Sequence, residues 1–550
     1  MPATTVPDLL DQRAGDAPDH EVAFPDRRLT YPELADAARH LAGALWAAGI
    51  RPGDHVGMLL HGGIDSMTTW LAAAHLGAVA VPVNPRLKPG ELAYILENAD
   101  IRLLFATAEL EPVLAEALPG LAAGIPGRLT LPIAPMLRAV VTVEPDGPTP
   151  RGWLTRARFE AAPTDPSAVA AARAGVRAED PALILYTSGT TSRPRGCVLD
   201  NASLVAEGEA VAERLGLGPQ DRFWTPLPMY HCGGYDVAVA ALAGGCGMVH
   251  VGVFEPGAAL RQLADERCTV AFPAFETIWL PVLDHPDFPT TDLSALRIVL
   301  NVGAAERLRS MQDRVAPAIQ MSSYGMTESC GFCCIGSPDD PPEARATTSG
   351  TPLRHMEIRV VDPETGRPVP PGTPGEVQFR GTSRIAYYHR DPELTADRID
   401  SDGWFASGDL AVADAHGRLT FLSRLKDMLK VGGENVAAAE VEGLLGGHPA
   451  CGVVQVVAAP DARLGEVPAA FVQLRPGAST TEQELIDYCL GTVATFKVPR
   501  YVRFVTEWPM SGTKVQKFRL RDDIAAELAE AGITEAPRLT SRCTPDGTLT

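Results

Sequence analysis

The sequence predicts an α/β protein: a large N-terminal region of several subdomains, in which helices cover mixed sheets, followed by a small α+β domain. Helix-like and strand-like patterns alternate along most of the chain, which is typical of a largely parallel sheet covered by helices. The 550 residues are too many for one compact core, and the pattern changes near residues 423–434. These observations predict two parts of unequal size.

The alternation begins in the first hundred residues. A helical pattern over residues 29–50 is followed by an Arg-Pro-Gly-Asp turn and by a buried-strand pattern at 55–62. A helix, a turn and a strand follow at 67–85, and the scheme repeats as far as residue 110. The apolar side chains expected on one face of the first helix are Leu34, Ala38, Leu41, Leu45 and Ile50.

The later segments complete the prediction. Residues 119–180 are rich in Ala, Pro and Arg with little pattern, so we expect them at the periphery, and the alternation returns from 181 to about 424. The polar residues 536–550 predict a disordered tail. The small domain is predicted from a helix, two strands and a second helix at 437–448, 452–460, 469–476 and 481–493.

Composition excludes several classes of protein. The chain has 48 Lys and Arg against 68 Asp and Glu, a formal net charge of −20, and nucleic-acid binding needs a basic face. Ten cysteines are too few for a disulfide scaffold. The longest apolar stretch, 237–254, is interrupted by glycines and a histidine, so we expect no membrane span and a cytoplasmic protein.

The sharpest local feature is the loop YTSGTTSRPRG, residues 186–196, which follows an apolar strand pattern and precedes a helix-compatible stretch. Its hydroxyls, glycine and arginines are the donors that phosphate oxygens need, because glycine lets backbone N–H groups approach and arginine pairs as a fork. The loop is not a P-loop, since the lysine pattern of that motif is absent. Taken alone, it could equally be a polar surface loop.

Eight other strings occur in a fixed order around this loop, and together with it they resemble the adenylate-forming superfamily of acyl-CoA synthetases, peptide-synthetase adenylation domains and luciferases. The resemblance covers roughly residues 25–530 and is strongest to the acyl-CoA synthetase branch. The strings are LTYPEL (29–34), VPVNPRL (81–87), TPLPMYHCGG (225–234), NVGAAE (301–306), SSYGMTES (322–329), DGWFASGDL (402–410), SRLKDMLKVGGENV (423–436) and PMSGTKVQKF (509–518).

The resemblance implies a reaction in two steps. An acid attacks the α-phosphate of ATP, giving an acyl-adenylate and pyrophosphate, and a thiol, usually that of coenzyme A, then displaces AMP. It also implies an AMP-binding domain over 1–424 with the ATP and acid sites, a hinge at 425–426 with Lys426, and a mobile domain over 427–535 that rotates between the two steps. Mg²⁺ would assist with ATP.

The resemblance assigns catalytic roles by motif. Lys514 would reach the α-phosphate and the acid only during adenylation, which suits a point charge on a flexible stem. Thr327 would touch the α-phosphate, and Glu328 would help to hold Mg²⁺, a metal that prefers oxygen ligands. His231 would be a gate beside the acid pocket, acting through its size and packing.

Further motif matches imply the binding sites. Tyr324 would lie against adenine, and Asp409 would accept both ribose hydroxyls. The residues assigned to the nucleotide are Thr187, Ser188, Gly189, Thr190, Thr191, Arg195, Gly303, Ala304, Ala305, Ser323, Tyr324, Gly325, Met326, Asp409 and Arg424. Those assigned to the acid pocket are Phe272, Phe275, Asn301, Val302 and Cys330, and those assigned to the thiol site are Gly432 and Gly433.

Several positions depart from the family pattern. Ser192 and Arg195 stand where relatives have Gly and Lys, and Asn301 and Val302 stand where Ser and Gly are common, which would reshape the pocket floor. The stretch before Lys514 is one residue short, so Lys517 remains an alternative catalytic lysine. No acidic residue is evident for binding a substrate ammonium group.

Three readings of the chain stay open. The first is an AMP-forming acid–CoA ligase acting on a small-molecule acid, as a monomer or homodimer. The second makes the same adenylate, from an ordinary or an unusual non-carboxylic acid, and passes it to a carrier-protein thiol or an amine. The third is a catalytically dead nucleotide-binding module, which would have no use for Lys514. A metal site at Cys330, Cys333 and Cys334 is disfavoured, because no second ligand pair has zinc spacing.

Overall fold

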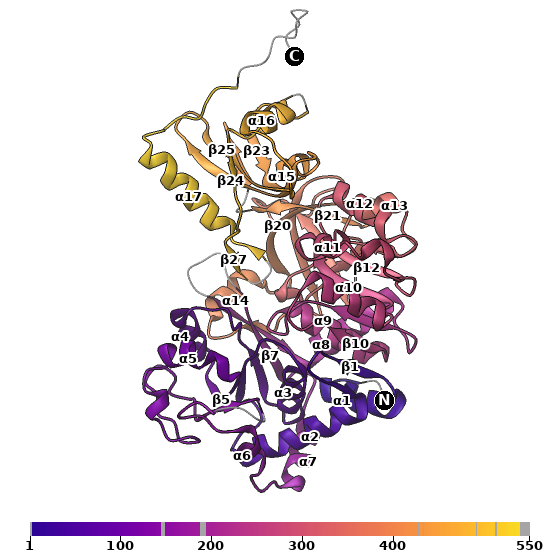
Figure 1. Ribbon diagram of the computed structural model, residues 1–550, viewed down its shortest axis with the longest axis vertical. Helices are drawn as coiled ribbons and strands as arrows, with labels where there is room; N and C mark the ends of the chain where they lie inside the picture. The colour runs from indigo at the N-terminus through magenta and orange to yellow at the C-terminus, as the bar shows by residue number, and fades with distance from the viewer. Residues whose placement is uncertain are drawn as a thin grey trace, which may run out of the picture.

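A computed structural model of the protein describes residues 3–144, 149–187, 194–425, 428–432, 434–490, 492–511 and 514–539. Figure 1 shows a large body built by most of the chain and a smaller body, built by its last part, at one end of the long axis. The chain leaves the large body after β21 (Leu419–Arg424), near the position where the sequence pattern changes.

Two seven-stranded, mostly parallel sheets form the large body, as the sequence predicts. In the first sheet β7 and β8 are antiparallel, and β19 adds an antiparallel edge. Its order is β19 (Tyr387–Tyr388), β8 (Arg195–Asp200), β7 (Pro181–Thr187), β4 (Val79–Pro82), β3 (His55–Leu59), β5 (Ile101–Ala106) and β6 (Ala139–Thr142). The order of the second is β13 (Ile319–Met321), β12 (Ile298–Val302), β11 (Val270–Phe275), β9 (Arg222–Thr225), β10 (Gly247–His250), β1 (Glu21–Ala23) and β2 (Arg28–Thr30).

Helices cover both sheets on both faces. The main hydrophobic core lies between the two sheets, and helices from both halves of the large body fill it. One further core lies on the outer face of each sheet. The inner helices are α1 (Val6–Asp16), α2 (Tyr31–Ala47), α3 (Ile64–His75), α8 (Asn201–Leu215) and α9 (Cys232–Gly244); the outer ones are α4 (Pro89–Asn98), α5 (Glu111–Ala117), α10 (Pro256–Asp265), α11 (Glu276–Leu283) and α12 (Ala305–Val315).

Helix α2 shows why these segments fold as they do. Thr30 caps it: its side chain accepts a hydrogen bond from Glu33 N–H (3.4 Å), and the Glu33 carboxylate accepts one from Thr30 N–H (2.8 Å). Pro32 occupies the first turn, where its missing N–H costs nothing. Leu34, Ala38, Leu41 and Leu45 are at most 1% exposed, which confirms the predicted face for these four. Ile50 is also buried, but it lies after the helix, which ends at Ala47.

A third, antiparallel sheet adjoins the other two and carries part of the nucleotide motifs. The small elements of the large body are spread over it, and α6 and α7 contact α2 (Figure 1). The strand β6 shows that the weakly patterned segment 119–180 also supplies an edge strand. The third sheet is β17 (Met356–Val361), β18 (Gly375–Gly381), β20 (Phe405–Ala413) and β21. The small elements are β14 (Ser323–Tyr324), β15 (Cys334–Ile335), β16 (Thr351–Pro352), α6 (Arg156–Glu160), α7 (Pro166–Gly175), α13 (Pro342–Thr347) and α14 (Pro392–Arg398).

The small body is a sheet with a helix-covered core on each face. Ala536 is buried and donates its N–H to Asp461 Oδ2 (2.6 Å), so the first residue of the predicted tail packs on the small body. The sheet order is β23 (Glu434–Ala437), β22 (Met428–Val431), β25 (Gly465–Leu474) and β24 (Cys451–Asp461), with β26 (Tyr501–Phe504) on β25. The remaining elements are α15 (Ala438–Gly446), α16 (Glu482–Leu490), α17 (Lys517–Glu530) and the hairpin of β27 (Met510–Ser511) and β28 (Lys514–Val515).

Among the described residues, no helix is both long enough and apolar enough to cross a membrane.

Candidate active site

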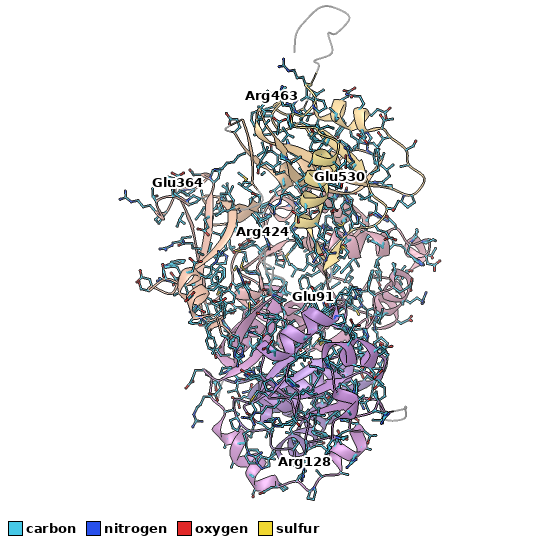
Figure 2. All side chains as sticks on the ribbon, turned by 90° about the vertical axis from the view of Figure 1, so that its left-hand side faces the viewer. Glu91, Arg128, Glu364, Arg424, Arg463 and Glu530 are labelled. Atoms are coloured by element: carbon cyan, nitrogen blue, oxygen red, sulfur yellow. The ribbon has the colours of Figure 1, made fainter. Side chains whose placement is uncertain are left out.

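Three predicted nucleotide residues meet at the third sheet. Tyr324 ends β14 and donates its hydroxyl proton to Asp409 Oδ2 (2.9 Å). Asp409 on β20 lies opposite Arg424 on β21, with 3.6 Å between Oδ1 and the arginine Nε. Tyr324 and Asp409 are buried, whereas Arg424 is exposed where the ribbons of the two bodies meet (Figure 2). Burial, together with the charge of Asp409, raises the pKa of the Tyr324 hydroxyl, so it remains a donor.

The aromatic side chain of Phe421 was not predicted for this site. Its ring is nearly parallel to that of Tyr324, at a centroid distance of 6.1 Å and an interplanar angle of 24°. Phe421 lies on β21 and is 40% exposed, unusually open for a large apolar side chain. The motif SRLKD begins two residues later, so its position was a weak indication in the sequence that Phe421 lies at the site.

Hydrogen bonds between side chains and backbone groups hold the turn before Asp409 in place. Ser407 Oγ accepts from Asp409 N–H (3.0 Å) and donates to the Val377 carbonyl (2.6 Å), so a hydroxyl here fixes the turn. Gly408 has φ +71° and donates its N–H to Glu376 Oε1 (2.9 Å). The positive φ explains the glycine between Ser407 and Asp409.

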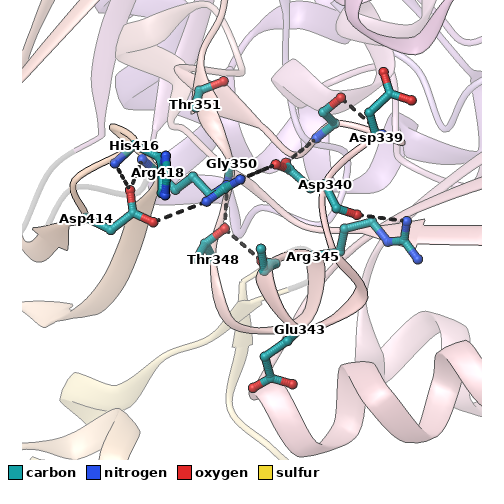
Figure 3. A network of polar contacts seen from close by, with 12 residues as sticks. Asp339, Asp340, Glu343, Arg345, Thr348, Gly350, Thr351, Asp414, His416 and Arg418 are labelled. Carbon is teal, nitrogen blue, oxygen red and sulfur yellow. Dashed lines mark hydrogen bonds and ion pairs between the residues drawn. The ribbon is translucent and has the colours of Figure 1, made fainter.

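A polar network fixes β21 from the other side (Figure 3). Arg418 donates from Nε to Asp340 Oδ1 (2.9 Å) and lies 3.5 Å from Asp414 Oδ2. Arg345 donates to the Asp340 carbonyl (3.1 Å). Ser349 donates its backbone N–H to the Leu419 carbonyl (2.7 Å), so the segment before β16 is bound to the start of β21.

The predicted metal residue Glu328 lies in a one-turn 3-10 helix, Thr327–Ser329. Tyr388, on the edge strand β19, donates its hydroxyl proton to Glu328 Oε1 (2.8 Å), and the Glu328 carbonyl accepts from Ile385 N–H (2.9 Å). Burial and the charge of Glu328 raise the pKa of Tyr388. Sequence reasoning missed Tyr388, because no motif marks it.

The phosphate loop joins two antiparallel strands. Thr187 at the end of β7 pairs with Arg195 at the start of β8, so a strand follows the loop and not the helix that the sequence favoured. The same strand β8 pairs with β19, and burial and the Glu328 charge raise the pKa of the Cys197 thiol on it. The base of the loop therefore lies near Glu328. Ser188, Gly189, Thr190 and Thr191 lie outside the described residues.

The predicted acid-pocket residues come from the carboxyl ends of neighbouring strands. Phe275 at the end of β11 is in register with Val302 at the end of β12, and Gly303 and Ala304 lead from there into α12 at Ala305. Asn301 is fully buried, donating to Met311 Sδ (3.3 Å) and accepting from Val302 N–H (3.1 Å). Val302 is 39% exposed, so of the two unusual floor residues it is the one that a ligand can reach.

Two more segments border this region. Phe272 on β11 packs against Phe332 at a centroid distance of 5.1 Å, close after the predicted Cys330. Cys330 is buried with φ +59°, which turns the chain sharply after Glu328. His231 precedes α9, with its ring 4.8 Å from that of Tyr230. The structure thus brings together β11, β12 and the segment after Glu328.

A pair of buried acids, Glu207 and Asp236, packs against the segment after Glu328, and the sequence analysis missed this pair. Glu207 on α8 accepts from Phe332 N–H (3.0 Å), and Asp236 on α9 accepts from Cys232 Sγ (3.3 Å). A side chain at Gly331 would bring its Cβ within 2.3 Å of both Asp236 oxygens. Burial raises the pKa of both carboxyl groups, and for Glu207 the charge of Asp236 adds to it. Both carboxyl groups are buried, so neither one is exposed for a substrate ammonium group, and the expectation on that point stays a prediction.

The predicted residues of the small body are described in part. Lys514 lies on β28, whose hairpin extends from the small body toward the large one beside α14 (Figure 1). The backbone of Gly432 has φ +61° and donates to the Leu464 carbonyl (2.7 Å). The side chain of Lys514 and the residues Gly433 and Lys426 lie outside what the structure describes.

Comparisons with known proteins agree with this geometry. The family model "AMP-binding enzyme" matches residues 10–389, and that of the "AMP-binding enzyme C-terminal domain" matches 440–514. A relative from Mycobacterium tuberculosis is 36% identical over 94% of this chain and 98% of its own. Its name is 3-[(3aS,4S,7aS)-7a-methyl-1,5-dioxo-octahydro-1H-inden-4-yl]propanoyl:CoA ligase.

Two solved structures have the same fold. The anthranilate CoA ligase AuaEII, in complex with anthranoyl-AMP, has a TM-score of 0.83 and 26% identity over 96% of this chain and 98% of its own. The amide bond synthetase McbA from Marinactinospora thermotolerans has a TM-score of 0.78 and 29% identity over 93% and 99%. The fold and the site therefore define an adenylate-forming enzyme.

The chain belongs to the AMP-binding enzyme family, with both its main and its C-terminal domain. The resemblance, the fold class and the assignment as an enzyme are thereby confirmed.

Proposed function

We propose that this enzyme activates a small-molecule acid with ATP, releases pyrophosphate, and transfers the acyl group from AMP to the thiol of coenzyme A. The arrangement of Tyr324, Asp409 and Arg424 carries the proposal. A buried carboxylate held by a tyrosine hydroxyl and faced by an arginine has one oxygen for each hydroxyl of a ribose. The adjacent ring of Phe421 adds an exposed aromatic surface for a base.

The phosphates would lie between Glu328 and the loop joining β7 and β8. Magnesium usually binds through one or two carboxylates and keeps its remaining positions for water and phosphate oxygens, so Glu328 alone is a sufficient protein ligand. Bound there, the metal would neutralise charge on the triphosphate. The hydrogen bond from Tyr388 orients Glu328, while Arg195, with its fork of donors, stands at the base of the loop.

Lys514 is the better candidate for the catalytic lysine. Lys517 Nζ lies 2.5 Å from Glu442 Oε1, within the small body, so its charge is already engaged. Lys514 lies on the hairpin that extends toward the large body. Its charge would stabilise the crowded anions where the acid meets the α-phosphate, a step in which positioning and charge neutralisation do most of the work.

The relatives' names support coenzyme A as the acceptor, but the similarity to an amide bond synthetase keeps a second candidate, transfer to an amine. Neither the relatives' names nor this similarity identifies the acid. Medium-chain, aromatic and other acids are therefore compared directly in the experiment below.

Acid-dependent exchange of pyrophosphate into ATP tests the adenylation, and it is measured over a panel of acids. Consumption of CoA thiol, measured with the acids that support exchange, then separates the acceptors. We expect both activities with the same acid. Exchange without thiol consumption, but with amide formation when amines are supplied, would establish the second candidate. Absence of exchange with every acid would exclude both.

A further inference from the structure

The two bodies contact each other through an arginine of α12. Arg307 belongs to the large body, yet its Nη2 donates a hydrogen bond to the carbonyl of Gly452 at the start of β24. Its Nε lies 3.4 Å from Glu276 Oε2 on α11. The side chain is only 11% exposed, so it is enclosed between the two bodies. A guanidinium can bind a carboxylate and a carbonyl together because its five donors point in fixed directions.

The small body has a surface that fits this arginine. At Gly446 an added Cβ would lie 3.2 Å from Arg307 Nε, and at Gly447 it would lie 2.8 Å from Glu306 Oε2. Two glycines at the end of α15 therefore leave the room that Glu306 and Arg307 occupy. Burial raises the pKa of Glu276, Arg307 lowers it, and the charge of Glu442 across the interface raises it.

The contact continues through rigid elements to the hairpin of Lys514. Glu442 on α15 accepts from Val456 N–H (2.6 Å) and pairs with Lys517, the first residue of α17. Only Gln516 separates β28 from α17, and its N–H donates to the Pro509 carbonyl (2.7 Å), which closes the base of the hairpin. The position of α15 relative to Arg307 therefore sets the direction of β27 and β28.

We propose that Arg307 is a positioning residue for the adenylation step: it holds the small body in the orientation that presents the Lys514 hairpin to the acid and ATP. This inference rests on the proposed function. Rotation of the small body breaks the bond to Gly452 and leaves Glu276 to partner Arg307 alone. Arg307 thus stabilises the orientation for the first step relative to that for the second.

The test compares Arg307→Ala with Arg309→Ala. Arg309 lies on the same helix but is 44% exposed and pairs with Glu343 inside the large body. We expect Arg307→Ala to lower kcat of pyrophosphate exchange about tenfold, the effect of losing one charge-assisted hydrogen bond, with little change in KM for ATP. Thioester formation from supplied acyl-AMP should not fall, and Arg309→Ala should match the wild type. Arg307→Lys should recover part of the exchange.

A second readout excludes a purely structural effect. Fluorophores on unnatural amino acids at positions 364 and 463, exposed sites on the large and small bodies, report the orientation by energy transfer (Figure 2). Arg307→Ala should broaden or shift the transfer efficiency before any acid is added. Unchanged exchange and transfer, an equal loss of both half-reactions, or a raised KM for ATP would overturn the proposal. Absence of pyrophosphate exchange in the wild-type enzyme would instead overturn the proposed function.

Discussion

At the scale of single residues, the proposed function makes Asp409 the main acceptor for the ribose of ATP. Asp409→Asn keeps the shape but removes the charge that faces Arg424 and would accept both ribose hydroxyls. We expect KM for ATP in pyrophosphate exchange to rise at least about tenfold, because charge-assisted hydrogen bonds contribute about 1.5–3 kcal/mol. Asp313→Asn, an exposed position on α12, is the control and should leave KM unchanged. Equal KM values for both variants would contradict the assignment.

Tyr388 should act through Glu328. Its hydroxyl fixes one carboxylate oxygen at 2.8 Å, and outer partners of this kind orient metal ligands. Tyr388→Phe is expected to raise the Mg²⁺ concentration for half-maximal exchange about tenfold while leaving the unfolding temperature nearly unchanged. Tyr387→Phe, the exposed neighbour, should behave as the wild type. A magnesium titration that superimposes on the wild type would remove Tyr388 from the metal site.

At the scale of elements, the packing of α8 on α9 encloses the acids Glu207 and Asp236. Burial raises the pKa of both above the value in an unfolded chain. Their contribution to stability is therefore fully present below about pH 4 and is lost as the pH rises toward the folded-state pKa, at about 1.4 kcal/mol per unit of pKa difference. The double variant Glu207→Gln, Asp236→Asn keeps the acceptors and removes this loss.

Unfolding temperatures measured from pH 5 to pH 9 test this. The unfolding temperature of the double variant should rise steadily relative to that of the wild type as the pH increases. Glu209→Gln, a half-buried position on α8, should follow the wild type. Parallel curves for the wild type and the double variant would mean that the acids are not protonated in the folded protein.

How much the sequence could predict also depends on the element. The buried face of α2 was predictable, because its apolar spacing and its capping residues both indicate a helix. Strand β8 was not predictable, since a short apolar run just before a helix can itself be either a strand or the first turn of that helix. Motif matches located Tyr324, Asp409 and Arg424 in advance. Tyr388, Phe421, Glu207 and Asp236 were hidden because only tertiary packing brings them to the site.

At the scale of the whole molecule, Lys514 should separate the two half-reactions. Lys514→Ala is expected to lower pyrophosphate exchange by at least about a hundredfold, because the charge that meets the anions is lost, and to leave thioester formation from supplied acyl-AMP largely intact. Lys497→Ala, whose ammonium pairs with Glu440 on the small body, is the control and should keep both activities. Equal loss of both activities in Lys514→Ala would refute the role.

Arg424 ends β21, the last strand before the chain enters the small body. Under the proposed function, a rotation of the small body would therefore displace the backbone next to Arg424, and a nucleotide bound to Arg424 would in turn restrain that rotation. Nucleotide binding and the orientation of the small body would then be coupled directly, through the short stretch of backbone that follows Arg424.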